Sequence, residues 1–180
     1  MLLIRSAMAL KVPRIGSLAP THDHLVMTTL KSRKLLGSAL VALQFACMLV
    51  LPVLAWPNIT SGNIPVLALT LATASLALLG WTLAYNKIGN FNIRPSPKKA
   101  GTLVMTGPYR WIRHPMYTAV LLGGASMAVI SPSLAGWGVF VFLSLVLLTK
   151  ANMEERWMCE KYPAYASYMQ ASKRLIPWIY

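Results

Sequence analysis

Two long stretches without a charged residue constrain the fold of this chain more than any other feature. Residues 35–56 and 64–85 contain no Asp, Glu, Lys, Arg or His. As helices rising 1.5 Å per residue, each would be about 33 Å long, enough to cross the hydrocarbon core of a bilayer, which is about 30 Å thick. Each stretch ends in an aromatic residue, Trp56 or Tyr85, as membrane-spanning helices often do at the interface. The two stretches therefore predict two transmembrane helices.

Two further apolar stretches, residues 115–130 and 134–149, are shorter. A helix over either one would be about 24 Å long, which is short for a complete crossing. The Ser-Pro-Ser sequence at 131–133 predicts a tight turn between them, so we expect a helical hairpin whose ends extend beyond the apolar part. Ala119 and Gly123 would let a neighbouring helix approach closely. The chain is therefore predicted to be an all-α integral membrane bundle of about four transmembrane helices.

The basic residues are distributed in a pattern typical of membrane proteins. The chain has 17 Lys and Arg against 4 Asp and Glu, a net charge of +13. The basic residues lie in residues 1–34, 86–113 and 150–180, whereas the loops at 57–63 and 131–133 carry no charge. With four crossings, the three basic segments fall on one side, which predicts that both termini are cytoplasmic. Nucleic-acid binding explains this clustering less well, so the expected partner is the lipid bilayer.

We expect three parts along the chain. Residues 1–34 are basic and expected to be disordered or to lie on the surface; residues 35–85 form two transmembrane helices; residues 86–180 hold a loop, the hairpin and a C-terminal tail. Cys47 and Cys159 do not make a disulfide framework, and no Cys/His cluster has the spacing of a metal site. No glycine-rich turn joins a strand to a helix, which excludes a Rossmann domain.

Two of the four acidic residues, Glu154 and Glu155, are adjacent near the end of the fourth apolar stretch. Counted outward from the turn, His114 and Glu154 differ in height by about 6 Å if both arms are helical. An interfacial charge pair neutralised by Lys150 and Arg156 is one interpretation. A functional site is the other, and we favour it because charges at membrane depth are costly unless paired or functional. The residues expected to meet at the cytoplasmic surface are Arg113, His114, Tyr117, Lys150, Glu154 and Glu155.

Two motifs in the second half resemble a known family. GTLVMTGPYRWIRHPMY, residues 101–117, closely resembles the cofactor loop of the isoprenylcysteine carboxyl methyltransferase and phospholipid methyltransferase group. EERWMCEKYPAYASYMQASKRLIP, residues 154–177, resembles the Glu-Glu pair and the aromatic, basic tail of that family. The resemblance covers about residues 80–180. It implies a membrane-embedded methyltransferase that uses S-adenosylmethionine and releases S-adenosylhomocysteine.

The resemblance also implies roles for individual residues. The residues that would contact the cofactor are Thr102, Leu103, Val104, Tyr109, His114, Pro115, Tyr117 and Glu154. Lys150 and Glu155 would be catalytic, with Glu155 in a supporting role. These residue types suit the cofactor. A glutamate carboxylate accepts hydrogen bonds from the amine or the ribose hydroxyls of the cofactor, and tyrosine rings attract its sulfonium cation. Pro115 also suits the first turn of a helix, whose N–H groups favour a carboxylate.

Departures from the family pattern leave the methyl acceptor open. Lys150 stands where the prenyl-protein branch has an arginine that meets the substrate carboxylate, and lysine lacks the bidentate fork of arginine. Pro163 and Ala119 replace glycines of the family pattern. The expected acceptor is lipophilic or amphiphilic: an isoprenylcysteine-like carboxylate or other prenylated substrate, a phospholipid amine, or a small lipophilic acid or thiol.

Two other functions remain alternatives at this point. A four-helix transporter or scaffold is disfavoured, because the apolar stretches hold no acid or base that would mark an ion pathway. A membrane reductase related to sterol reductases is the second, because those enzymes share a distant relative of this C-terminal half. Such a reductase would bind a nicotinamide cofactor instead of S-adenosylhomocysteine.

Overall fold

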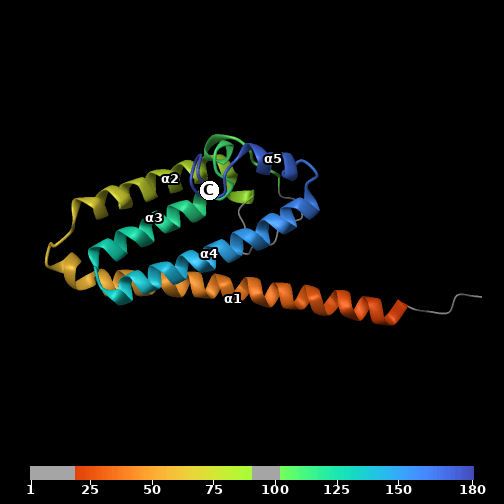
Figure 1. The fold of residues 1–180 in the computed structure, drawn as a ribbon, viewed down its shortest axis with the longest axis horizontal. Coiled ribbons are helices and arrows are strands. Elements are labelled where there is room, and N and C mark those ends of the chain that lie inside the picture. The colour runs from red at the N-terminus through yellow and green to blue at the C-terminus, as the bar shows by residue number, and fades with distance from the viewer. Residues whose placement is uncertain (1–18, 91–101) are drawn as a thin grey trace, which may run out of the picture. The chain divides into compact units, whose positions relative to one another are not determined.

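The computed structural model describes residues 19–90 and 102–180 (Figure 1). Its elements in chain order are the helices α1 (Ala19–Thr60) and α2 (Val66–Asn90), the 3-10 helix η1 (Gly107–Arg110), and the helices α3 (Pro115–Ile130), α4 (Leu134–Lys161) and α5 (Tyr165–Ala171). Within these two ranges the chain forms no β-strand. The all-α prediction is therefore confirmed.

Helix α1 begins well before the apolar stretch that predicted it. Residues 19–34, which we expected to be disordered or to lie on the surface, are helical, whereas residues 1–18 lie outside the described residues. Residues 21–36 contain neither Gly nor Pro, so nothing in the sequence interrupts the helix. The chain divides into two units, Met1–Lys34 and Leu35–Tyr180, and the helical bundle and its polar cluster belong to the second.

Three helical segments in the described part of the chain are long and apolar enough to cross a membrane, judged by length and composition. They are Lys31–Thr60, Val66–Asn86 and Leu134–Lys161, and Pro115–Ile130 is a shorter apolar helix. The hairpin's second helix is thus longer than its apolar stretch, because the helix continues through the polar residues that follow residue 149. The prediction of a multi-pass membrane bundle is confirmed, whereas the side on which the termini lie stays a prediction.

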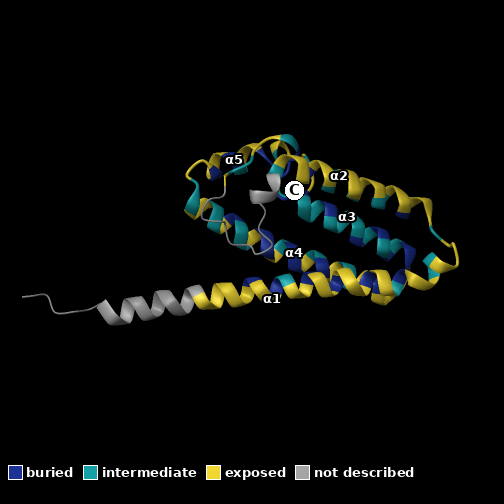
Figure 2. Cartoon of the chain, turned by 180° about the vertical axis from the view of Figure 1, so that it is seen from behind, coloured by how far each residue is buried: buried dark blue, intermediate teal, exposed yellow. Residues whose placement is uncertain are grey.

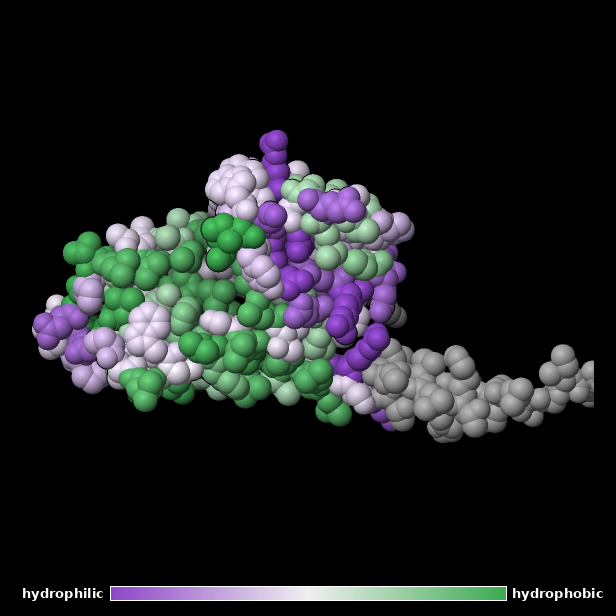
Figure 3. All heavy atoms as spheres, in the orientation of Figure 1, coloured by the Kyte–Doolittle hydropathy of each residue, from purple (hydrophilic) through white to green (hydrophobic). Residues whose placement is uncertain are grey.

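The outer faces of the helices are apolar. Large exposed side chains include Leu49 and Val53 on α1, Leu67 and Leu76 on α2, and Leu145 on α4. Figure 2 shows exposed residues along α1 and α2, and Figure 3 shows hydrophobic side chains over most of the helical bundle. Hydrophilic side chains gather at the end of the bundle where α5 lies. An apolar exterior of this extent is expected of a surface that faces lipid.

Helix α1 packs on α4 through one stripe of its surface. Cys47 and Leu51 form a buried cluster with Leu143 and Leu147. The stripe also includes Gln44, which is 8% exposed, and the spacing of these α1 positions places them on one helix face. This stripe therefore determines which α1 side chains reach the interior of the bundle.

Helices α2 and α3 approach closely through small residues. Ser75 Oγ donates to Ala119 O at 2.7 Å, and Ser126 Oγ donates to Ala68 O at 2.8 Å. A Cβ added to Gly123 would lie 3.2 Å from Ser75 Oγ, closer than most real contacts. The predicted small-residue surface is confirmed, and hydrogen bonds of this kind join helices within membranes.

The turn between α3 and α4 is as short as predicted. Ser133 caps α4, because its Oγ accepts from Gly136 N at 3.0 Å. Asn58 Nδ2 of α1 donates to Ile130 O at 2.6 Å and so satisfies a carbonyl that the end of α3 leaves free. The hairpin is therefore confirmed, and its tip is tied to α1.

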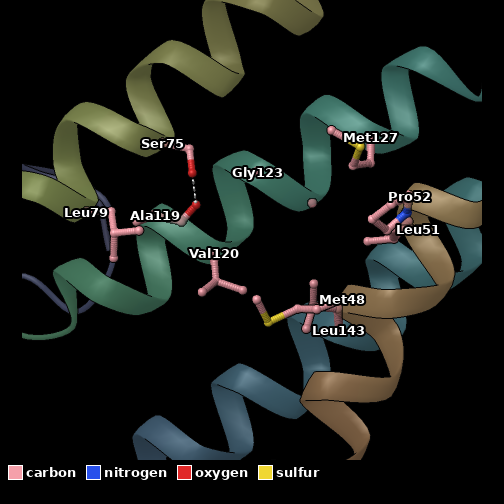
Figure 4. Close-up of a pocket in the computed structure, with 11 residues that line it drawn as sticks. Met48, Leu51, Pro52, Ser75, Leu79, Ala119, Val120, Gly123, Met127 and Leu143 are labelled. Carbon is pink, nitrogen blue, oxygen red and sulfur yellow. Dashed lines mark hydrogen bonds between the residues drawn. The ribbon is translucent and has the colours of Figure 1, made fainter. Parts of the chain in front are cut away.

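An apolar cavity of about 220 Å³ lies among the four helices. Its lining includes Met48 of α1, Leu79 of α2, Val120 and Gly124 of α3, and Leu143 of α4. Figure 4 shows Val120 and Met48 pointing toward one another. The cavity is therefore lined by helices that are far apart in the sequence.

Candidate active site

The backbone of the loop before α3 pairs with the C-terminal tail. Arg113 N donates to Lys173 O at 2.8 Å, and His114 N donates to Arg174 O at 3.1 Å. Lys173 N donates in return to Trp111 O at 2.9 Å. Ile112 and Lys173 thereby form an isolated parallel β-bridge. One arginine of the loop and one of the tail are thereby held beside the acidic end of α4.

Glu155 is the centre of this arrangement and is only 3% exposed. Its Oε1 accepts from Arg113 Nε at 2.7 Å and lies 3.3 Å from His114 Nε2. Its Oε2 accepts from Arg174 Nη2 at 2.6 Å and from Nε at 3.1 Å. The bond to Glu155 raises the pKa of Arg174. Both oxygens of Glu155 are thus engaged, and the side chain joins the loop, α4 and the tail.

Glu154 has a different environment, since its side chain is 30% exposed. Its Oε2 accepts from Tyr117 Oη at 2.9 Å and lies 3.5 Å from His114 Nδ1. Among the described residues, Oε1 has no hydrogen-bond partner. Burial and then the charge of Glu154 raise the pKa of Tyr109. Glu154 therefore has one oxygen bound to Tyr117 and a second that no described residue engages.

His114 bridges the two glutamates. Burial lowers its pKa, but hydrogen bonds and the charges of Glu154 and Glu155 outweigh burial and raise the pKa above its ordinary value. When protonated, the ring can donate from both nitrogens, of which Nδ1 faces Glu154 and Nε2 faces Glu155. The ring of Tyr117 stacks on it, with centroids 5.2 Å apart and an interplanar angle of 7°. The imidazole and a tyrosine ring thus form one wall beside Glu154.

Lys150 is 2% exposed and lies one turn before Glu154 on α4. Its Nζ donates to Gln44 Oε1 of α1 at 2.5 Å and lies 5.1 Å from the centroid of the Tyr117 ring. No carboxylate of the described residues lies within 4.0 Å of it. Lys150 is therefore a buried ammonium paired with a neutral amide.

The structure brings most of the predicted site residues together. The predicted proximity of Arg113, His114, Tyr117, Glu154 and Glu155 is confirmed by their contacts, and Lys150 borders Tyr117.

The remaining predicted residues lie on the loop that leads into α3. Pro115 is the first residue of α3 with His114 as its N-cap, as expected, and Tyr109 lies in η1. Leu103 and Val104 are half-buried and Thr102 is exposed, in an irregular segment. The functional roles of all these residues stay predictions.

The sequence did not predict the importance of three residues, two of which lie at the site and one in the loop that leads into α3. Arg174 was counted only as part of the basic tail, although it forms an ion pair with Glu155 at 2.6 Å. Gln44 lies in an apolar helix and had no motif around it. Gly107 belongs to the loop motif, and the motif did not predict its left-handed backbone, with φ of 61°.

Gly107→Ala is expected to destabilise the loop that precedes α3. An added Cβ would lie 2.5 Å from Tyr85 Cδ1 and 2.7 Å from Cδ2, and the positive φ is itself strained for alanine. The expected loss is about 1–3 kcal/mol, measured as a lower thermal midpoint in detergent by tryptophan fluorescence. Gly138→Ala is the matched control, because an added Cβ there has no neighbour within 4 Å. Equal midpoints for the two variants would contradict the close approach of the loop to α2.

Two curated relatives match part of the chain. An uncharacterized protein of Schizosaccharomyces pombe is 37% identical over 78 residues, which is 40% of this chain and 23% of the relative. The cobalt-zinc-cadmium resistance protein CzcN of Cupriavidus metallidurans is 33% identical over 84 residues, 46% of this chain and 38% of the relative. The matched region thus spans well under half of the length of either relative.

A family profile matches a larger part of the chain. The profile described as phospholipid methyltransferase covers residues 66–165, which is more than half of the sequence. The match runs from α2 through η1 and the α3–α4 hairpin to the first residue of α5. It therefore contains the loop and both glutamates of the cluster, and the chain belongs to the phospholipid methyltransferase family of membrane methyltransferases.

Proposed function

We propose that this chain is a membrane-embedded methyltransferase that uses S-adenosylmethionine to methylate an amphiphilic acceptor at the cluster around Glu154. The observation that carries the proposal is the contrast between the two glutamates. Glu155 is saturated by protein partners, whereas one oxygen of Glu154, beside Tyr117, has no partner within residues 19–90 and 102–180. A carboxylate with an open oxygen beside a tyrosine ring is suited to a ligand that carries a positive charge.

The residues of the cluster fit the cofactor. Glu154 would accept from the amine or the ribose hydroxyls, and the face of Tyr117 would attract the sulfonium. His114 and the N–H groups of the first turn of α3 would receive the carboxylate. Leu103 and Val104, which are half-buried, would offer apolar contacts to the adenine. When bound, S-adenosylmethionine supplies a methyl group that leaves its sulfur, and the bonding electrons stay on that sulfur.

The contribution of the protein is then position and exclusion of water. Methyl transfer is an in-line displacement, so holding the two reactants in line accounts for much of the rate. His114 and Lys150 are both more than nine-tenths buried, which restricts water beside the reacting groups. Glu155 acts in support, because it holds Arg113, His114 and the tail in place.

The acceptor is proposed to be an amphiphile. The polar cluster adjoins the membrane helices, and the apolar cavity lies among them. An isoprenylcysteine-like carboxylate, a phospholipid amine and a small lipophilic acid or thiol all combine a polar head with an apolar tail. The cytoplasmic location of the reaction is part of the same proposal and follows from the basic loops.

Calorimetric titration of the detergent-purified full chain with S-adenosylhomocysteine tests the proposal. Saturable binding is expected, with no binding of NADPH in a parallel titration. Absence of binding at millimolar S-adenosylhomocysteine would overturn the methyltransferase proposal, and binding of NADPH alone would favour a reductase. Incubation of membranes with methyl-labelled S-adenosylmethionine, followed by lipid extraction, then identifies the class of acceptor.

A further inference from the structure

Among the described residues, the buried ammonium of Lys150 has no carboxylate within 4.0 Å. A charged side chain at membrane depth is expected to be paired or functional, and a buried charge without a partner is costly. In the described part of the chain, its one hydrogen bond goes to the neutral Oε1 of Gln44, and its other close neighbour is the ring of Tyr117. Within the described residues, the fold thus keeps a poorly solvated cation that no carboxylate contacts directly, and the charge of Glu154, one turn later on α4, acts on it only from beyond 4.0 Å.

Gln44 is the second member of this pair and comes from α1. It is 8% exposed, and its Nε2 donates to Met48 Sδ at 3.8 Å. A thioether sulfur is a weak acceptor, so the amide N–H has no strong partner. An ammonium and an amide N–H, both available for a stronger acceptor, therefore lie side by side.

We propose that Gln44 is a specificity-determining residue of the acceptor site. Its neutral oxygen positions the Lys150 ammonium without neutralising it, and its amide N–H donates together with that ammonium to one anionic oxygen group on the acceptor. The acceptor is then an amphiphile with a carboxylate-type head. This inference rests on the proposed function. It means that α1, which lies outside the matched family region, contributes to substrate specificity.

The charge of the cluster favours an anionic head over an amine. The charged side chains are Arg113, Lys150 and Arg174 against Glu154 and Glu155, which leaves one positive charge before His114 is counted. S-adenosylmethionine carries a sulfonium, an amine and a carboxylate, and so adds another. A protonated amine would increase this excess in a poorly solvated place, whereas a carboxylate would reduce it.

The apolar cavity begins one helical turn beyond the pair. On α1, Met48 follows Gln44 by about 6 Å, and on α3, Val120 follows Tyr117 by about 4.5 Å. Met48 and Val120 both line the cavity of about 220 Å³ (Figure 4). An anionic head at Lys150 would therefore direct its tail into the cavity. For this reason we assign the pair to the acceptor, and the carboxylate of the cofactor to His114 and the start of α3.

Binding of radiolabelled decanoate to the purified full chain, by scintillation proximity with saturating S-adenosylhomocysteine, tests the inference. Unlabelled decanoate should displace the radiolabelled ligand at least about tenfold better than decanol or decylamine do, because only decanoate offers an anionic oxygen to the charged Lys150. Gln44→Glu places a carboxylate on Lys150. It is expected to weaken decanoate binding about tenfold, to remove the preference for an anionic head, and to leave S-adenosylhomocysteine affinity and the thermal midpoint intact.

Two further variants separate a structural role from specificity. Gln44→Met removes the amide but leaves the ammonium charged, so decanoate binding is expected to weaken while its preference over decylamine remains. Gln170→Glu makes the same change of charge at an exposed position of α5, and wild-type behaviour is expected.

Three results would overturn the inference. One is a wild type without preference for decanoate, and another is a Gln44→Glu variant that keeps the preference. The third is a Gln44→Glu variant that loses S-adenosylhomocysteine instead of decanoate, which would mean that Lys150 holds the carboxylate of the cofactor. Failure of the wild type to bind S-adenosylhomocysteine is a separate result and would count against the proposed function.

Discussion

The Glu155→Gln variant is expected to lose about 3–5 kcal/mol of stability and to melt about 10 °C below the wild type in detergent. The carboxylate accepts from Arg113 and Arg174 and faces His114. A glutamine keeps the shape but not the charge, so cationic side chains would remain buried without a counter-charge. Because the same carboxylate joins the tail to the loop, trypsin is expected to cleave the C-terminal tail faster in the variant.

Glu160→Gln is the matched control for this experiment. It makes the same change on the same helix at an exposed position, where surface substitutions usually change stability by about 0.5 kcal/mol or less. If the two variants have the same thermal midpoint and the same rate of tryptic cleavage, then Glu155 does not hold the tail. That result would contradict the supporting role of Glu155 in the proposed site.

The hairpin and the meeting of its two ends could be predicted from the sequence, because both follow from helical rise alone. The turn at residues 131–133 fixes where two antiparallel arms start, and counting outward from it places His114 near Glu154. The observed distance between His114 Nδ1 and Glu154 Oε2 is 3.5 Å. Pro115 at the start of α3 was likewise predictable, since proline is accommodated in the first turn.

Gln44 and Arg174 could not be placed from the sequence, for two different reasons. In a soluble helix, apolar periodicity identifies the buried face, but in a membrane helix the lipid-facing and bundle-facing sides are both apolar. Nothing in the local pattern therefore showed that Gln44 faces α4. Arg174 reaches Glu155 only because the tail pairs with the loop before α3, a tertiary contact without a helical period to count.

The two adjacent glutamates differ because neighbouring residues on a helix point about 100° apart. Glu155 faces the loop and the tail, where its partners are protein cations. Glu154 faces Tyr117 and shares its side of α4 with Lys150, four residues earlier. The same dipeptide thus provides one carboxylate that joins the loop and the tail, and one with an oxygen that no described residue engages.

The Glu154→Gln variant is accordingly expected to bind S-adenosylhomocysteine about 10- to 100-fold more weakly than the wild type, as loss of a hydrogen bond to a charged group implies. Its thermal midpoint without ligand is expected to stay close to that of the wild type. The side chain is 30% exposed, and a glutamine oxygen still accepts from Tyr117 Oη. Calorimetric titration and thermal unfolding on the same preparations measure both quantities.

Comparison of this variant with Glu155→Gln separates binding from architecture. Glu154→Gln should lose affinity with its fold intact, whereas Glu155→Gln should lose stability first. Affinity lost by Glu154→Gln without loss of stability would support direct contact between that carboxylate and the ligand. Wild-type affinity in Glu154→Gln would contradict the assignment of its open oxygen to the cofactor.

Tyr117 donates to the same carboxylate. Tyr117→Phe should therefore weaken S-adenosylhomocysteine binding less than Glu154→Gln does, because the aromatic face remains and only the hydroxyl is lost.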